Sequence, residues 1–415
     1  MDANLNDGLD QLLSTMLHSH EGVSDLIFVA GKPPQVEACG KLRPATMDAG
    51  ASVLNTARIE GLARAIINGN ARLARDLADT GSCDCSYILR DVSRFRVNIY
   101  RQNGNLAMVL RRLQVEIPSL DKLNLAPVFR EVIKEKNGII FVTGGTGSGK
   151  TTTLAALLNE INQQSEVHIV TLEDPIEFLH PHLKATFSQR ELGRDFFTFP
   201  DGLRAALRQA PKVILVGEIR DRETMEIALA AAETGHAVYS TLHTISAAQT
   251  ISRVLGMFDQ EEEKQLRERL AETLRYVISQ RLVPRQGGGR LLITELMGSS
   301  LRTREAIALG ENENRRLNDI IEAGNTSGWH SFEQSLTRAY EQNLITEETA
   351  LLYCVNRNHM RQRIDSINKC RETSPAGIVL KMKGSDRGHG PSPPAPTPMA
   401  LFAATARSAS TKVPS

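Results

Sequence analysis

The most informative residues of the sequence form a glycine-rich run, Gly144–Thr151, with the letters GGTGSGKT. The run matches the pattern GxxxxGK[ST], follows an apolar stretch (IIFVT) and precedes a helix-like stretch (TTTLAALLNEIN). Glycines let successive backbone N–H groups face phosphate oxygens, and a helix N-terminus adds partial positive charge. Lys150 is predicted to reach the β- and γ-phosphates of ATP, and the Thr151 hydroxyl to ligate Mg2+. The residues expected to contact the nucleotide are Gly144, Gly145, Thr146, Gly147, Ser148, Gly149, Lys150, Thr151 and Thr152.

An acidic segment, Thr171–Glu177 (TLEDPIE), follows the next apolar stretch, VHIVTL. Glu173 and Glu177 lie where a strand of an α/β sheet ends, which is the edge at which such sheets bind ligands. Both carboxylates are therefore candidates for orienting magnesium or the attacking water. Taken alone, the segment fits an exposed acidic turn better than a functional site.

A third segment, Lys212–Asp221 (KVILVGEIRD), is a buried-strand pattern that ends in an acidic residue. This is the Walker B layout, although Gly217 stands where many P-loop enzymes have a magnesium-binding Asp. Glu218 is then expected to orient and polarise the attacking water. Thr151 and Glu218 are the residues expected at the magnesium ion that the nucleotide brings.

Two histidines bracket the fourth segment, Gly235–Thr244 (GHAVYSTLHT). His243 comes at the carboxyl end of a strand, so it could sense the γ-phosphate or couple it to movement. His236 precedes the same strand and is also a candidate for nucleotide contact. Zinc binding by the pair is not expected, because no Cys lies nearby and a whole strand separates them.

These segments belong to a region where strands and helices alternate, the pattern of a parallel sheet with helical crossovers. The predicted strands are Gly138–Thr143, Val167–Leu172, Lys212–Val216 and Ala237–Thr241. The predicted helices are Thr151–Asn162, Phe199–Gln209 and Arg222–Thr234. A further helix is predicted over Gln260–Arg281, because one helical stripe collects Leu266, Leu270, Leu274, Val277 and Ile278. The fold class is α/β, with a P-loop ATPase domain at its centre.

The chain before this region mixes short strands and helices and predicts a smaller α+β domain over residues 1–115. A helix is expected at Thr56–Ile67, with its end near Asn68–Asn70 (NGN). Residues 116–125 are predicted to be a linker, and residues 126–370 the ATPase domain with a helical C-terminal part. Residues 371–415, rich in Pro, Ser and Ala, are predicted to be a disordered tail.

Composition is that of an ordinary globular protein: 415 residues, 41% hydrophobic and 23% charged. Lys plus Arg at 49 nearly balances Asp plus Glu at 48, so no overall field indicates direct nucleic-acid binding. Five scattered cysteines predict free thiols in a reducing compartment. The acidic N-terminus is unlike a secretory signal, and no apolar run approaches the ~18 residues of a membrane helix. A cytoplasmic location is therefore expected.

The four segments GGTGSGKTT, TLEDPIEF, VILVGEIRD and GHAVYSTLHT together resemble the Walker A, Asp box, Walker B and His box of secretion and type IV pilus ATPases. The resemblance to this PilT/GspE/PilB superfamily runs from about Ser24 to Asp365 and is strongest to the PilT/PilU branch. The extension-type members carry a four-cysteine zinc site, whereas no cysteine occurs here between Cys85 and Cys354. The sequence departs from the family pattern at Arg208–Lys212 (RQAPK), where an acidic RxDPD is common.

The resemblance implies a PAS-like N-terminal domain, a RecA-like ATPase domain and assembly into a homo-hexamer. It implies peripheral association with the inner face of the inner membrane, through a pilus platform protein and the pilin machinery. Glu218 corresponds to the catalytic glutamate and Glu177 to that of the Asp box. Arg96 and Arg111 correspond to arginines that reach the nucleotide phosphates, a task suited to the permanently charged guanidinium.

The function expected is hydrolysis of Mg-ATP to power type IV pilus retraction and twitching motility. Two other readings stay open. One is a related secretion or conjugation-type ATPase or accessory pilus ATPase, of which a DNA-translocating form would show nucleic-acid stimulation with steep salt dependence. The other is a nucleotide-gated scaffold that binds ATP without hydrolysing it.

Overall fold

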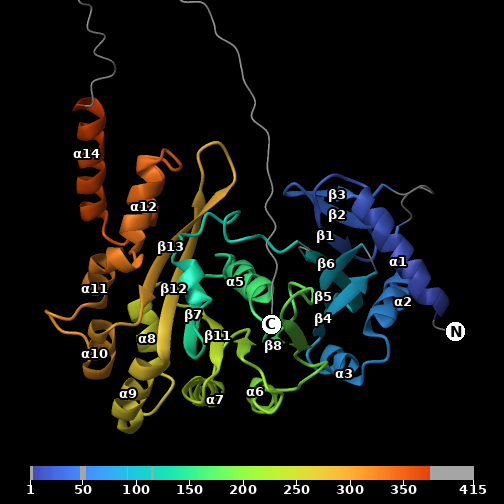
Figure 1. Cartoon of the computed structure of the whole chain (residues 1–415). Helices are drawn as coiled ribbons and strands as arrows, with labels where there is room; N and C mark the ends of the chain where they lie inside the picture. The colour runs from blue at the N-terminus through green and yellow to red at the C-terminus, as the bar shows by residue number, and fades with distance from the viewer. Residues whose placement is uncertain (1–2, 47–52, 91, 114–115, 374–415) are drawn as a thin grey trace, which may run out of the picture. The chain divides into compact units, whose positions relative to one another are not determined.

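The N-terminal part of the chain folds around an antiparallel sheet of six strands. The computed structural model describes residues 3–46, 53–90, 92–113 and 116–373. The strand order is β3-β2-β1-β6-β5-β4 (Figure 1). The strands are β1 Val23–Phe28, β2 Gln35–Ala38, β3 Lys41–Pro44, β4 Ser82–Leu89, β5 Ser93–Gln102 and β6 Asn105–Leu113. The helices are α1 Ala3–His18, α2 Thr56–Ile67 and α3 Ala71–Asp79.

Local sequence explains how these elements form. In β5, Phe95, Val97 and Ile99 are fully buried and alternate with more exposed residues, the period of a strand with one face on a core. Helix α2 begins after Asn55, whose side chain accepts from the Arg58 amide at 2.8 Å. It ends at Asn68 with φ 45°, a left-handed conformation that Asn tolerates well. The predicted helix and its end are confirmed.

The second sheet has seven strands in the order β13-β12-β7-β11-β10-β8-β9. All neighbours are parallel except β13, which pairs antiparallel with β12. The strands are β7 Gly138–Gly144, β8 His168–Glu173, β9 Thr186–Glu191, β10 Val213–Val216, β11 Ala237–Leu242, β12 Leu274–Pro284 and β13 Arg290–Gly298. The four predicted strands are confirmed within two residues of their ends.

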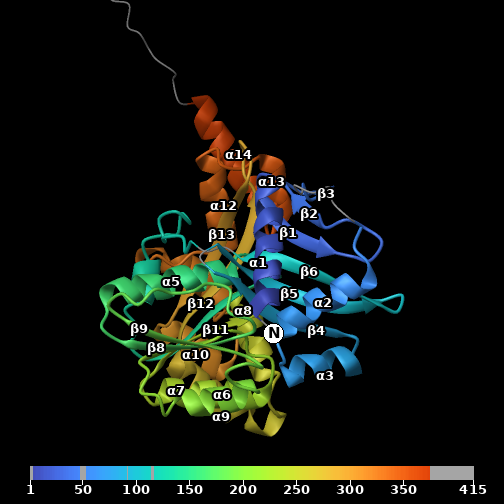
Figure 2. The same cartoon turned by 90° about the vertical axis from the view of Figure 1, so that its right-hand side faces the viewer.

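Helices cover both faces of this sheet. The chain passes from β7 outward to β8 and then returns through β10 and β11, so right-handed crossovers place the first connecting helix opposite the later ones. Figures 1 and 2 show α5 on one face and α6 and α7 on the other. Their bounds are α5 Lys150–Gln164, α6 Phe199–Ala206 and α7 Arg222–Glu233. Each sheet has its own hydrophobic core, so the expected α/β architecture with a preceding α+β part is confirmed.

The helix predicted over Gln260–Arg281 is wrong in its second half. The chain is helical over α9, Glu263–Thr273, but continues directly into β12 beside β7. Val277 and Ile278 are fully buried inside the sheet. A strand that lies between two others and under helices is apolar on both faces, and periodicity cannot separate such a short run from a buried helix.

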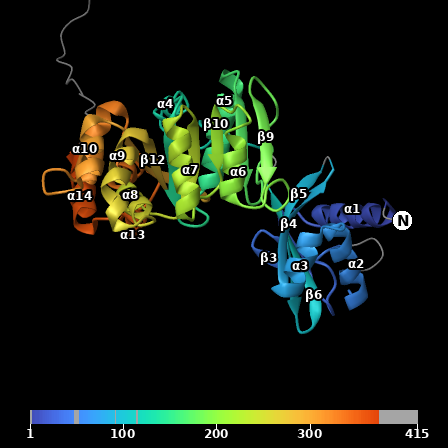
Figure 3. The same cartoon turned by 90° about the horizontal axis from the view of Figure 1, so that it is seen from below.

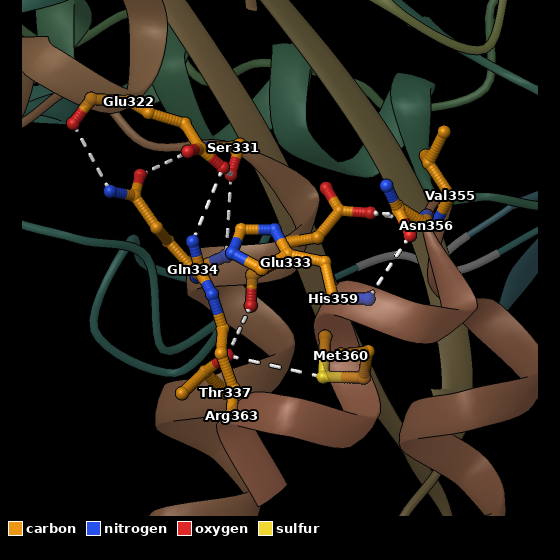
Figure 4. A network of polar contacts seen from close by, with 10 residues as sticks. All are labelled: Glu322, Ser331, Glu333, Gln334, Thr337, Val355, Asn356, His359, Met360 and Arg363. Carbon is orange, nitrogen blue, oxygen red and sulfur yellow. Dashed lines mark hydrogen bonds and ion pairs between the residues drawn. The ribbon is translucent and has the colours of Figure 1, made fainter. Parts of the chain in front are cut away.

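The remaining helices are α4 Phe129–Val132, α8 Ala247–Leu255, α10 Leu301–Leu309, α11 Leu317–Ala323, α12 Phe332–Glu341, α13 Glu347–Tyr353 and α14 Arg357–Thr373. Among them, α8, α11, α12 and α13 pack against the β12–β13 hairpin. Figure 3 shows α8, α9 and α10 beside one another near β12. The Glu333 carboxylate accepts from the amides of Val355 and Asn356 at 2.7 and 3.0 Å, which fixes the start of α14 (Figure 4). It meets backbone N–H groups that a helix start leaves unpaired.

No helix among the described residues has the length and apolar character needed to cross a membrane. The predicted tail, 371–415, lies outside the described residues except for its first three residues, which are helical and end α14.

Candidate nucleotide-binding site

The glycine-rich run forms a tight turn between β7 and α5. Every residue of β7 is buried, and the strand ends at Gly144 with φ 147°. A Cβ on Gly144 would lie 2.5 Å from Ser148 Oγ and 2.6 Å from the Gln280 carbonyl oxygen. Gly149, with φ 91°, turns the chain into the first residue of α5. Only glycine fits these positions without a backbone shift, so the predicted P-loop geometry follows from the sequence.

Lys150 folds back over the turn. Its Nζ donates to the carbonyl oxygens of Gly144 and Gly145 at 2.9 and 3.1 Å. Burial lowers the pKa of Lys150, while the charges of Glu218 and Glu177 oppose that change. A partly desolvated ammonium at the start of a helix attracts phosphate oxygens strongly.

A pocket of about 370 Å³ opens at the carboxyl edge of the sheet above this turn. Its size lies within the range of small-molecule sites. The predicted site residues that line it are Arg96, Thr146, Gly147, Lys150, Thr151, Glu173, Glu177, Glu218 and His243. The structure therefore brings residues of all four sequence segments to one cavity.

Glu218 follows β10 and lines the pocket together with Lys150. Its Oε2 accepts from Arg220 Nη2 at 2.8 Å, and its Oε1 lies 3.2 Å from His243 Nε2. Burial raises the pKa of Glu218, but the hydrogen bond and charge of Arg220 and the charges of His243 and Lys150 outweigh it and hold the pKa below its usual range. The carboxylate is thus ionised and can accept a proton or orient water.

Glu173 ends β8 and is nearly inaccessible to solvent. It accepts from Thr171 Oγ1 at 2.6 Å and from Gln189 Nε2 at 3.3 Å. Burial raises its pKa to about 7, although both hydrogen bonds lower it. Glu177 lines the same pocket, half-buried and near enough to Lys150 to influence its charge. The acidic segment is therefore part of the pocket rather than an exposed turn.

Outside the segment GGTGSGKTT, two predicted residues, His236 and Arg111, do not line the pocket. His236 precedes β11 and lies at the amino edge of the sheet, where its Nδ1 contacts the Ala231 carbonyl oxygen at 3.0 Å. Arg111 lies on β6 and its Nε donates to Asp25 Oδ1 at 2.8 Å. Parallel strands place the two ends of β11 at opposite edges, so His236 and His243 cannot meet the same ligand.

Comparison with known proteins identifies the family. Residues 88–359 match the family described as "Type II/IV secretion system protein". The chain belongs to this family. The type IV pilus retractation ATPase PilT of Pseudomonas aeruginosa is 39% identical over 330 residues, 80% of this chain and 94% of that protein. The type IV pilus ATPase PilU of the same organism is 35% identical over 356 residues, 86% of this chain and 91% of that protein.

A solved structure gives the same result for the fold. The crystal structure of the pilus retraction motor PilT with bound ADP has a TM-score of 0.77 and 38% sequence identity, covering 85% of this chain and 98% of that one. The resemblance predicted from the four segments and the two-part fold are confirmed.

Two residues with contacts near the pocket, Arg220 and Glu191, are not among those predicted from the sequence. Arg220, two residues after Glu218 in the Walker B segment, could have been found from its spacing. Glu191 could not, because β9 is a short polar strand without a clear pattern. Its carboxylate accepts from Ser86 Oγ at 2.8 Å and lies 3.7 Å from Arg94 Nη2. These contacts hold β4 and β5 beside β9, which is how Arg96 on β5 comes to line the pocket.

Proposed function

We propose that the chain is the subunit of a homo-hexameric motor that hydrolyses Mg-ATP to power type IV pilus retraction and twitching motility. The observation that carries the ATPase part is that Lys150 and ionised Glu218 both line one pocket at the P-loop and influence each other's charge. The pilus part rests on similarity over most of the chain to proteins of that system.

The residues fit a magnesium nucleotide. Among the described residues no cluster of three or more His, Cys, Asp or Glu could hold a metal ion by itself. Proteins usually bind Mg2+ through one or two side chains together with substrate phosphates. Thr151 and Glu218 are the residues that would hold it, and the ion would neutralise phosphate charge.

The chain's own residues then divide the work. The N–H groups of the P-loop and Lys150 bind and orient the triphosphate. Glu218 positions the attacking water, and His243 holds one of its carboxylate oxygens. Arg96 supplies positive charge from the N-terminal sheet. Glu173 and Glu177 supply further carboxylates to the pocket lining, and their role is to order water there.

The partners and place of action come from the family. We assign the chain to the cytoplasmic face of the inner membrane, where it associates peripherally through a platform protein and the pilin machinery. No direct binding of nucleic acid is proposed.

The ATPase part is tested with purified full-length protein. Lys150→Ala should abolish phosphate release, and Glu218→Gln should still bind a fluorescent ATP analogue while releasing no phosphate. Lys134→Ala is the matched control, since Lys134 is an exposed lysine paired with Glu131. Wild-type turnover in the Lys150→Ala protein would overturn the assignment of the site.

The pilus part is tested in cells of the source organism that lack the chain. Long pili that do not retract, with restored retraction on expression of the wild type but not of Glu218→Gln, support the proposal. Cells without pili would instead indicate a role in assembly, and unaltered pili would indicate a different secretion system.

A further inference from the structure

A buried carboxylate outside the pocket, Glu295 on β13, connects three parts of the ATPase domain. Only 3% of its surface is exposed. Its Oε1 accepts a hydrogen bond from the Ala247 amide at 2.7 Å. Buried carboxylates are rare unless they meet specific donors, and the Ala247 amide is such a donor for Glu295.

Ala247 is the first residue of α8 and comes four residues after His243. The turn between them is ordered from within. Gln249 Oε1 accepts from the Ile245 amide at 2.7 Å, and the hydroxyls of Thr244 and Thr250 lie 2.7 Å apart. These contacts join the turn to the start of α8, and Glu295 attaches both to the β12–β13 hairpin.

The other side of Glu295 leads to the P-loop. Ser279 of β12 stands directly opposite Glu295 in the strand register, and its hydroxyl lowers the pKa of that carboxyl group. The Ser279 hydroxyl also accepts from Thr143 Oγ1 at 3.1 Å. Thr143 directly precedes Gly144. Glu295 thus lies between the strand that ends in the P-loop and the turn that carries His243.

The charges around Glu295 come from the same hairpin and the C-terminal helices. Burial raises its pKa to about 7, the Ala247 hydrogen bond and Arg281 lower it, and Glu333 raises it. Arg281 is held in place by stacking over the Phe332 ring at 4.0 Å. The acceptor oxygen for Ala247 is present in either protonation state, so the attachment of α8 does not depend on ionisation.

We propose that Glu295 is a positioning residue for ATP hydrolysis, which fixes His243 against Glu218 by binding the amide at the start of α8. The inference rests on the proposed ATPase function. The contact between His243 Nε2 and Glu218 Oε1 is 3.2 Å long. Since His243 lies on an exposed turn with nearly half of its side chain in solvent, a shift of α8 would separate the pair without disturbing the P-loop.

The first test compares Glu295→Ala, Glu295→Gln and a matched control in the full-length protein. Glu295→Ala should lower kcat about tenfold, the effect of one positioning hydrogen bond, and leave the KM for ATP within about twofold. Glu295→Gln retains an acceptor oxygen and should keep most of kcat. Ser335→Ala is the control, because the Ser335 hydroxyl donates to the neighbouring Thr294 carbonyl oxygen at 2.6 Å and makes no hydrogen bond to α8 or His243 among the described residues.

A double-mutant cycle separates positioning from a general loss of structure. In a His243→Ala background, Glu295→Ala should cause no further loss of kcat, because the pair it positions is already gone. Independent, multiplicative losses would overturn the proposal, and so would a rise in KM at constant kcat. If Glu295→Ala does not fold, Glu295→Asp keeps the carboxylate but withdraws it by one methylene, and the same cycle applies.

The outcomes distinguish this inference from the proposed function. Wild-type protein without any ATP hydrolysis would refute the proposed function. An active wild type whose kcat is insensitive to Glu295→Ala and Glu295→Asp would refute the positioning role alone.

Discussion

Replacing Glu295 by Gln should stabilise the protein at alkaline pH and have little effect at acidic pH. Burial is the main cause of the raised pKa of Glu295, about 7 in the folded protein against an ordinary value of 4.5. Below pH 4.5 the carboxyl group is neutral in both the folded and the unfolded chain. Above pH 7 it is ionised in both, and the folded chain then holds a buried charge. Stability of the wild type is therefore lost as the pH rises through this window.

The magnitude follows from the two pKa values. The pKa of Glu295 rises from 4.5 in the unfolded chain to about 7 in the folded chain. At ~1.4 kcal/mol per pH unit, this rise lowers the free energy of unfolding at alkaline pH by about 3 kcal/mol. Gln at position 295 has no charge and still offers an oxygen to the Ala247 amide. The free energy of unfolding of Glu295→Gln should exceed that of the wild type by almost nothing at pH 4.5 and by about 3 kcal/mol at pH 8.

The assay is urea denaturation followed by tryptophan fluorescence. Trp329 is the single tryptophan of the chain and is 8% exposed. The next residue, His330, forms a β-bridge with Leu296, which directly follows Glu295. The emission of Trp329 therefore reports on this part of the protein. Glu313→Gln, at an exposed position, serves as the control and should give no pH-dependent difference. Parallel pH profiles for the wild type and Glu295→Gln would show that the burial argument is wrong.

Three further predictions concern the site and its supports. Gly144→Ala should weaken ATP binding by about 10- to 100-fold in fluorescence titrations, because a Cβ would meet the Gln280 carbonyl oxygen at 2.6 Å and such backbone strain costs about 1–3 kcal/mol; unchanged affinity would contradict the P-loop geometry. Phe95→Ala should destabilise the N-terminal part by about 3–5 kcal/mol in chemical denaturation, since the ring is fully buried; a loss below 1 kcal/mol would exclude it from the core. Arg96→Ala should raise the KM for ATP about tenfold in steady-state assays, the effect of one charge-assisted hydrogen bond; an unchanged KM would remove Arg96 from the site.

The sequence predicts the P-loop half of the site because local residue types determine it. Gly144 and Gly149 need conformations that only glycine adopts readily, and Lys150 and Thr151 are placed by the helix that they begin. Glu218 and His243 follow from the rule that parallel strands meet at their carboxyl ends. The same rule, applied to strand direction, would have excluded His236.

Other parts of the site depend on packing that the sequence does not express. Arg96 and Arg111 stand directly opposite each other on β5 and β6 and therefore lie on the same face of the sheet, so residue type and strand position do not distinguish them. Only Arg96 lines the pocket, because Arg111 is engaged by Asp25 of β1. The role of Glu295 could not be predicted from the sequence either, because its partners, the Ala247 amide and the Ser279 hydroxyl, belong to other elements.

Two neighbouring residues of strand β12, Gln280 and Arg281, contact different helices. Gln280 donates to Thr153 Oγ1 of α5 at 2.7 Å, whereas Arg281 stacks on Phe332 of α12. Successive residues of a strand point to opposite faces, so a step of one residue separates the nucleotide-binding helix from the C-terminal helices. Deleting a single residue before Gln280 would exchange the two faces and present a guanidinium to α5. The number of residues between the start of β12 and Gln280 is therefore fixed by the packing partners on both faces of the strand.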